Sequence, residues 1–276
     1  MNIVYFVIGN NVVIHMQVEF SIRTILSQIS DDDTIYVVTD TPTMYCYLPH
    51  VIIIPISNER IKEWRGKHDF FWRVKIKVLQ HIAQISPNKA IMYLDGDTYL
   101  HGSLTEIKAL LSNNCGMMHL DEGCPSEMKE RSLSMWQTVN GKTYAGVTIS
   151  TRHHMWNAGI VAIPVSIVGK VTDMALAVCD SMLDDGSEPV TVEQYALSIA
   201  LFECANHLVA ANKWIGHYWH YKYHWSSYIA NFFVLAYRKS FSLEKQIDLI
   251  RKTNLKRVHR WILIKRTFAK LTGQIY

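Results

Sequence analysis

Two aspartates separated by one glycine follow a short hydrophobic stretch near the middle of the sequence. Residues 90–94 form an unbroken apolar run, which is typical of a strand buried on both faces of a parallel sheet. Because side chains alternate along an extended chain, we expect Asp95 and Asp97 to project to the same side, with Gly96 leaving room for a ligand. Carboxylates at the carboxyl end of such a strand suit Mg²⁺ or Mn²⁺ held against a phosphate group. The alternative is a solvated turn.

Two later stretches carry amide and acidic groups that suit sugar hydroxyls. Asn157 lies in WNAGIVAIP, where small residues follow it and an apolar run then continues as a predicted buried strand. Glu193 and Gln194 lie in the first turn of a helix predicted to begin near Thr191. The alternatives are a turn asparagine and an acid favoured only by the helix dipole.

The stretch IGHYWHYKYHW, residues 215–225, is dense in histidine and aromatic rings. His217 or His220 could supply a nitrogen ligand to the same divalent ion, and Lys222 could bind a phosphate. Histidine is also common as a hydrogen-bonded core residue, which is the alternative.

The order of predicted elements indicates an α/β fold that would bring these groups together. Strands are predicted over 2–8, 34–39 and 51–54, with a helix between the first two, and the apolar run before Asp95 would be a fourth. Right-handed crossovers would place the ends of the first, second and fourth strands at one edge of a doubly wound sheet. Candidate nucleotide contacts at that edge are Ile8, Asn10 and Asp40. A turn or helix-cap role is the alternative for Asp40.

A lysine lies on the apolar face of the helix predicted before the central strand. Lys75 falls on the stripe formed by Phe71, Val74, Val78 and Ile82, so it could point at the strand ends and meet a diphosphate. The alternative is that its amino group reaches the surface.

The segment 113–154 is long and mixed, and we expect it to be an irregular lid or substrate loop with Trp136 exposed. Within it, His119, Asp121 and Glu122 follow a predicted strand and could face the same crevice. Solvated loop residues are the alternative.

Composition indicates a globular protein with a sizeable core. The chain has 276 residues, of which 49% are hydrophobic, and a net charge of +4. No signal-like start and no apolar run long enough to span a bilayer is visible, so we expect a cytoplasmic location. The five cysteines are scattered, and they indicate neither a disulfide framework nor a zinc cluster.

The C-terminal part differs in charge from the rest. Residues 238–270 hold eleven Lys and Arg and two acids. We therefore predict a catalytic domain over 1–237 and a basic, amphipathic helical tail over 238–276, in which Trp261 and Phe268 lie on the apolar line. Such a tail could bind an anionic membrane on the cytoplasmic face, or pack on the domain with a solvated basic face. Nucleic acid is not expected as a partner, because the body is acidic and no recognition motif is visible.

Taken in order, these motifs resemble those of the GT-A fold glycosyltransferases, and most closely glycosyltransferase family 8, which includes lipopolysaccharide hexosyltransferases and glycogenin. The resemblance covers residues 1 to about 225 and lies in FWRVKIKVL, LDGDTYLHGSL, WNAGIVAIP, Glu193-Gln194 and HYWHYK. It implies a Rossmann-like mixed sheet flanked by helices. The last motif departs from the family pattern, because His220 stands where glycine is usual and Lys222 comes one position early and is not followed by proline. The first residue of the Glu-Gln pair is more often aspartate in the family.

The resemblance implies a role for each candidate residue. Asp95 and Asp97 would bind the metal and the nucleotide diphosphate, and His217 would complete the metal site. The other implied contacts are Lys75, Gly96 and Lys222 with the donor, Asn157 and Gln194 with the transferred sugar, and Glu193 with its hydroxyls.

The activity implied is transfer of a hexose from a nucleotide-diphosphate sugar, most simply a UDP-sugar, to a glycan or glycolipid acceptor in lipopolysaccharide or polysaccharide biosynthesis. Mn²⁺ or Mg²⁺ would stabilise the leaving diphosphate, and the anomeric configuration would be retained. One alternative is a carbohydrate-binding or scaffold protein with a degenerate GT-A fold. A phosphatase of the haloacid dehalogenase type is a weaker one, because Thr98 is adjacent to the second aspartate instead of two residues beyond it.

Overall fold

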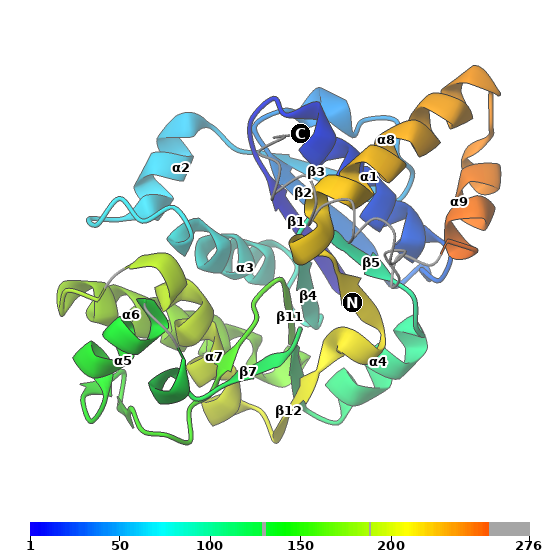
Figure 1. Cartoon of the computed structure of the whole chain (residues 1–276). Helices are drawn as coiled ribbons and strands as arrows, with labels where there is room; N and C mark the ends of the chain where they lie inside the picture. The colour runs from blue at the N-terminus through cyan, green and yellow to red at the C-terminus, as the bar shows by residue number, and fades with distance from the viewer. Residues whose placement is uncertain (129–130, 188, 254–276) are drawn as a thin grey trace, which may run out of the picture.

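A mixed β-sheet with helices on both faces forms the centre of the protein (Figure 1). The computed structural model describes residues 1–128, 131–187 and 189–253. Within these residues the main sheet has seven strands, in the order β12-β6-β11-β4-β1-β2-β3. The strands are β1 (Asn2–Val7), β2 (Thr34–Thr39), β3 (Val51–Pro55), β4 (Ile91–Leu94), β6 (Cys115–Met118), β11 (Ile160–Ile163) and β12 (His207–Ala210).

All strands of this sheet except β11 run in the same direction. β1 is parallel to β2 and β4, and β2 is parallel to β3, as the strand and helix order predicts. β11 lies antiparallel between β4 and β6. The structure thus has the predicted α/β class with a Rossmann-like mixed sheet, and it places the ends of β1, β2 and β4 at one edge.

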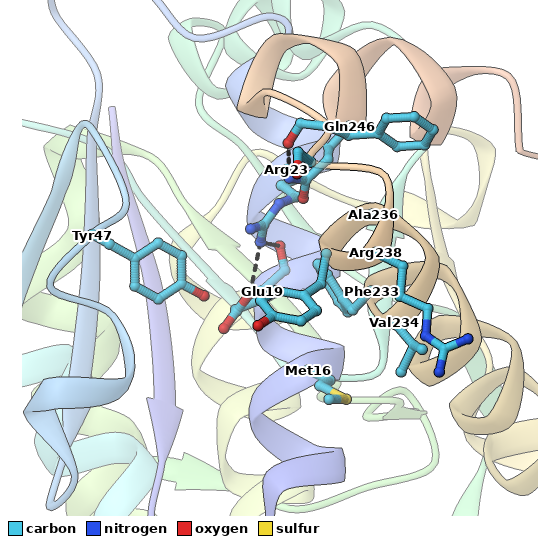
Figure 2. Close-up of a pocket in the computed structure, with 12 residues that line it drawn as sticks. Met16, Glu19, Arg23, Tyr47, Phe233, Val234, Ala236, Arg238 and Gln246 are labelled. Carbon is cyan, nitrogen blue, oxygen red and sulfur yellow. Dashed lines mark hydrogen bonds and ion pairs between the residues drawn. The ribbon is translucent and has the colours of Figure 1, made fainter.

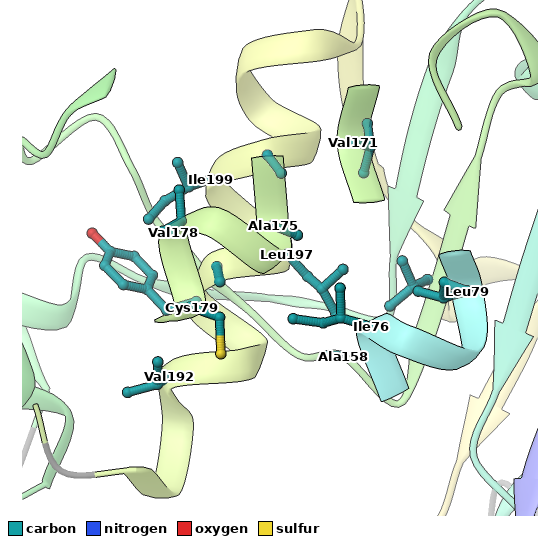
Figure 3. Packing of buried hydrophobic residues seen from close by; sticks show 14 of the residues in the cluster. Ile76, Leu79, Ala158, Val171, Ala175, Val178, Cys179, Val192, Leu197 and Ile199 are labelled. Carbon is teal, nitrogen blue, oxygen red and sulfur yellow. The ribbon is translucent and has the colours of Figure 1, made fainter. Parts of the chain in front are cut away.

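Alternating side chains of the strands fill two cores, one on each face of the sheet. On β1, Ile3, Tyr5 and Val7 face the core with α1 and α4, while Val4 faces the core with α3, α6 and α7. Figure 3 shows the packing of α3, α6 and α7 residues in the second core. The helices are α1 (Val12–Leu26), α2 (Asn58–Arg65), α3 (Arg73–Ile85), α4 (Leu104–Ser112), α5 (Arg131–Val139), α6 (Val168–Asp184), α7 (Val192–Cys204), α8 (Lys222–Arg238) and α9 (Leu243–Arg251).

Small two-stranded sheets support the edge where the strands end. β5 (Thr98–Leu100) pairs with β13 (Ile215–His217), and β7 (Asp121–Gly123) pairs with β10 (Met155–Trp156), while β8 (Thr143–Tyr144) and β9 (Val147–Thr148) form a hairpin. The expectation of an irregular lid over 113–154 is therefore wrong in part, because the segment contains β7, α5, β8 and β9 besides the predicted strand, which is β6. Trp136, expected to be exposed, is buried in the core because it lies on the inner face of α5.

The C-terminal helices pack on the outer side of α1. Trp225 and Ile229 of α8 and Ile250 of α9 share a buried cluster with Phe20 of α1. The predicted tail is therefore helical over α9, and residues 254–276, with Trp261 and Phe268, lie outside the described residues. Among the helices that are described, none is both long and apolar enough to cross a membrane.

Candidate active site

A cavity of about 410 Å³ lies at the edge where β1 and β4 end. Asp95, Gly96, Asp97, Asn157, His217 and Lys222 all line it, so three distant parts of the chain meet there. Its walls are largely aromatic and aliphatic, from Phe6, Val7, Ile8, Ile14, Val18, Phe71, Trp72, Tyr93 and Trp219. A pocket with apolar walls and a few convergent charged groups is typical of a ligand site.

The two aspartates reach the cavity from a turn between β4 and β5. The strand ends at Leu94, and Gly96 and Asp97 form the turn, so strand alternation is not what brings the two carboxylates to one side. A β-carbon at Gly96 would lie 2.8 Å from Cγ2 of Val18, so glycine here lets α1 approach the turn closely. The Tyr93 hydroxyl donates a hydrogen bond to Asp95 Oδ1 over 2.9 Å and orients that carboxylate.

His217 is carried to the aspartates by the pairing of β13 with β5. The antiparallel register places His217 opposite Thr98, the residue after Asp97. Its Nε2 lies 3.3 Å from Asp97 Oδ1. One ligand atom each from Asp95, Asp97 and His217 lie within 4.8 Å of one another, and among the described residues this is the group of acids, histidines or cysteines suited to one metal ion. The neighbouring His220 instead stacks on Trp219, with ring centroids 3.4 Å apart.

Asp97 is a buried carboxylate placed between His217 and Lys222. Burial alone would raise its pKa, but His217 and Lys222 lower the pKa to about 2. Lys222 Nζ lies 3.1 Å from Asp97 Oδ2, and its side chain remains half exposed at the mouth of the cavity. Lys222 is therefore placed to meet an anion that enters the site.

Asn157 lies beside the metal-ligand group because β11 runs antiparallel to β4. The start of β11 is opposite the end of β4, and the Asp95 N–H donates to Gly159 O over 2.8 Å. Asn157 Oδ1 accepts from the Gly159 N–H and lies 3.2 Å from His217 Nδ1. A β-carbon at Gly159 would come within 2.2 Å of the His217 ring, so the position of His217 requires glycine there.

Gly159→Ala should therefore displace the His217 ring while the fold is kept, since the backbone at Gly159 is not in the left-handed region. We expect Mn²⁺ affinity, measured by titration calorimetry, to fall by at least about tenfold, the order found when the surroundings of a metal ligand are disturbed. Gly169→Ala in α6 is the matched control, because a β-carbon there meets nothing within 4 Å. Unchanged affinity in Gly159→Ala would contradict the placement of His217.

Lys75 does not line the cavity, but it contacts the lining residue Asp95 as part of a buried charged group. Its side chain is only 5% exposed, so the alternative of a surface lysine is wrong. Lys75 Nζ lies 3.0 Å from Glu193 Oε1 and 3.7 Å from Asp95 Oδ1, and it donates to Ala158 O. Burial opposes charge on Lys75, but the carboxylates of Asp95 and Glu193 outweigh it and raise its pKa. Burial raises the pKa of Glu193, which Lys75 partly offsets.

Asn157 and Gln194 both donate hydrogen bonds to Glu122, one of the residues predicted to face the same crevice. Glu122 accepts hydrogen bonds from Asn157 Nδ2 over 3.1 Å and from Gln194 Nε2 over 2.9 Å. Gln194 Oε1 accepts from the Ala158 N–H. Its position a few residues after the predicted strand, now β6, was the signal for Glu122, but its two partners could not be predicted from it.

The remaining predicted nucleotide contacts lie around the end of β1. Ile8 lines the cavity. Asp40 follows β2 and accepts the Gly9 N–H with both carboxylate oxygens, at 2.9 and 3.1 Å, which fixes the turn after β1. Asn10 is exposed in that turn. Asp40 thus serves as a turn-stabilising residue in the structure, and a ribose contact stays a prediction.

A larger cavity, of about 640 Å³, lies elsewhere, between α1, α8 and α9 (Figure 2). Arg23 pairs with Glu19 over 2.9 Å there, and its guanidinium lies 4.8 Å from the centre of the Phe233 ring. Its lining includes none of the candidate metal-binding or sugar-binding residues described above. The candidate active site is therefore the smaller of these two cavities, and its charged and polar lining residues identify it, not its volume.

The donor set of Asp95, Asp97 and His217 fits a divalent cation. His217 Nδ1 faces Asn157 Oδ1, and Nε2 faces Asp97 Oδ1 across 3.3 Å, where a hydrogen bond from His217 helps to lower the pKa of the Asp97 carboxyl. A cation bound by both side chains would take the place of the proton between them. Two carboxylates and one imidazole leave further positions on an ion open for phosphate oxygens.

Comparison with known proteins gives a likeness in structure only. No protein-family model matches the chain, and no curated protein matches it. A crystal structure of the galactosyltransferase LgtC in complex with donor and acceptor sugar analogs is similar at a TM-score of 0.49 and 14% identity, covering 76% of this chain and 73% of that one. A structure of an active-site mutant of LgtC is similar at 0.49 and 13%, covering 76% and 72%.

Proposed function

We propose that the protein is a metal-dependent glycosyltransferase that moves a hexose from a nucleotide-diphosphate sugar to a glycan or glycolipid acceptor. The observation that carries the proposal is the convergence of Asp95, Asp97 and His217 with Lys222 and Asn157 on one cavity. The cavity thus combines a candidate cation site with a half-exposed ammonium group and an amide, which are the groups that bind a diphosphate and a sugar.

Each part of the donor would meet a different group of residues in or beside the cavity. Asp95, Asp97 and His217 would hold the metal, which supplies Lewis-acid stabilisation of the diphosphate as it leaves. Lys222 at the mouth would bind the same diphosphate, because its half-exposed ammonium group can contact an incoming anion as well as Asp97. The turn after β1, with Ile8 and Asn10, would receive the nucleoside, whose base could stack on an aromatic wall residue.

The amides on the far side of the cation site would bind the transferred sugar. Hydrogen bonds to Glu122 fix the orientation of Asn157 and Gln194. Glu193, the neighbour of Gln194, forms a buried ion pair with Lys75. No carboxylate other than the proposed metal ligands Asp95 and Asp97 lines the cavity, within the part of the chain that is described. The rate enhancement would therefore come from positioning and leaving-group stabilisation, with retention of configuration.

Manganese is the ion we expect the site to prefer over magnesium. Mg²⁺ favours an octahedral set of oxygen ligands, and an imidazole nitrogen in the set suits a later divalent metal. UDP-sugars are the donors we propose first.

The exposed basic residues of the C-terminal helices would favour an acceptor presented at an anionic membrane. Arg238, Lys239, Lys245, Arg251 and Lys252 are all exposed. Each could add electrostatic attraction near an anionic surface.

The experiment is a screen of nucleotide sugars for release of free nucleoside diphosphate, with Mn²⁺, with Mg²⁺ and with chelator. Metal-dependent release from one sugar nucleotide is the expected result. Binding of the nucleotide without any turnover on a panel of acceptors would indicate a carbohydrate-binding protein instead. Hydrolysis of simple phosphate monoesters would indicate a phosphatase.

A further inference from the structure

We propose that Glu122 is a positioning residue that sets the orientation of both amides at the sugar side of the site and, through Asn157, the ring of His217. This inference rests on the proposed function, because it concerns the proposed sugar-binding amides and a proposed metal ligand. Glu122 does not line the cavity and would touch neither the metal nor the diphosphate.

Glu122 is brought to the two amides by strand pairing. It lies on β7, which pairs antiparallel with β10, and Asn157 directly follows β10. Gln194 reaches the same carboxylate from the first turn of α7. Each oxygen of Glu122 serves one amide, Oε1 for Asn157 and Oε2 for Gln194.

An ionised carboxylate can only accept hydrogen bonds, so it admits one orientation of each amide. The NH₂ groups must face Glu122, and the carbonyl oxygens must face away. Asn157 Oδ1 then accepts from the Gly159 N–H, and Gln194 Oε1 accepts from the Ala158 N–H, both at 3.1 Å. A flipped amide would set its NH₂ against a backbone N–H donor.

The orientation of the Asn157 amide determines the hydrogen bond that the His217 ring makes. Asn157 Oδ1 lies 3.2 Å from His217 Nδ1, so this orientation of the amide requires a proton on Nδ1, which donates it. Nε2 then faces Asp97 and the cation site, where a bound metal ion would take the place of any proton on Nε2. A hydrogen bond to the far nitrogen of a metal-binding histidine fixes its tautomer and ring orientation in this way.

Glu122 is exposed, and this separates a positioning role from a structural one. An exposed hydrogen-bonding side chain contributes little to the stability of a fold. Glu122→Gln should therefore fold like the wild type. Its single acceptor oxygen can serve only one amide, and its own NH₂ would oppose the other.

The test measures Mn²⁺ affinity by titration calorimetry on the protein alone, together with kcat and donor KM. For Glu122→Gln we expect Mn²⁺ affinity to fall about tenfold or more, the order seen when the partner of a ligating histidine is lost. Asp121→Asn is the matched control, because Asp121 bonds His154 and the Gly123 N–H and neither amide. Its Mn²⁺ affinity should stay within about twofold of the wild type, well inside the loss expected when such a partner is removed.

A double variant tests the direction of the hydrogen bonds. In Glu122→Gln with Asn157→Asp, the new amide can donate to residue 157 and still accept from Gln194, while the new carboxylate can accept from Gly159 and His217. We expect this pair to recover most of the lost Mn²⁺ affinity, and Asn157→Asp alone to lose it.

Unchanged Mn²⁺ affinity in Glu122→Gln, or no recovery in the double variant, would overturn the inference. Wild-type protein that binds Mn²⁺ but transfers no sugar would overturn the proposed function and leave the positioning role of Glu122 standing.

Discussion

Asp97→Asn is expected to abolish sugar transfer while the protein stays folded. The variant removes a proposed metal ligand and the carboxylate that contacts both His217 and Lys222. Loss of a preorganised electrostatic contact typically lowers kcat by about 10²- to 10³-fold, and loss of the metal itself would add to this. The measurement is turnover at saturating Mn²⁺ with the best donor of the screen.

Asp97→Asn is also expected to lower the free energy of unfolding. The pKa of Asp97 is about 2 in the folded protein, below that of an unfolded aspartate. Its ionised form therefore stabilises the fold above about pH 4, and this contribution is lost as the pH falls towards 2. Asp97→Asn should lower the free energy of unfolding by about 2 kcal/mol at pH 7 and flatten its dependence on pH in that window. Wild-type turnover in the folded variant would contradict the metal role.

Lys75→Met is expected to be the most destabilising change near the site. It leaves Glu193 buried and without its cation, and removing one partner of a buried pair costs about 3 to 5 kcal/mol. Burial already raises the pKa of Glu193, and loss of Lys75 would raise it further. A carboxyl whose pKa is higher in the folded than in the unfolded protein favours the fold in its protonated form. It destabilises the fold once the pH rises above its unfolded pKa. The stability of Lys75→Met should therefore decline as the pH rises above about 4.

The control is the same variant with Glu193→Gln added. A neutral amide in place of the acid removes the uncompensated charge, so denaturant unfolding should show most of the stability recovered and the new pH dependence gone. A Lys75→Met protein as stable as the wild type at pH 7 would show that Lys75 and Glu193 are not the buried pair described.

The parallel part of the fold was predictable because each of its strands is marked locally. Apolar runs end in a glycine turn or an acid at β1, β2 and β4, and right-handed crossovers then fix their order. β11 was predicted as a buried strand, but its antiparallel direction in the main sheet could not be predicted from its own residues, since it is a buried apolar run like the others. The α5 segment was not predicted as a helix, and its Trp136 is buried in a core shared with residues that are distant in the sequence.

The candidate site was predictable as a set of residue types and less so as a set of contacts. Asp95 and Asp97 meet in one cavity as predicted, but through a turn instead of strand alternation. The choice between His217 and His220 depends on the register of β13 with β5, which pairs segments more than one hundred residues apart. The pairing of Lys75 with Glu193 and the two hydrogen bonds of Glu122 are of the same long-range kind, so no local pattern could reveal them.

The central claim is that one cation is held by Asp95, Asp97 and His217 against the diphosphate of a donor. A crystal structure with Mn²⁺ and UDP, with anomalous differences collected at the manganese edge, tests it directly. The account predicts one strong anomalous peak between those three side chains, with phosphate oxygens completing the coordination. A peak elsewhere on the chain, or a diphosphate bound away from these residues, would contradict it.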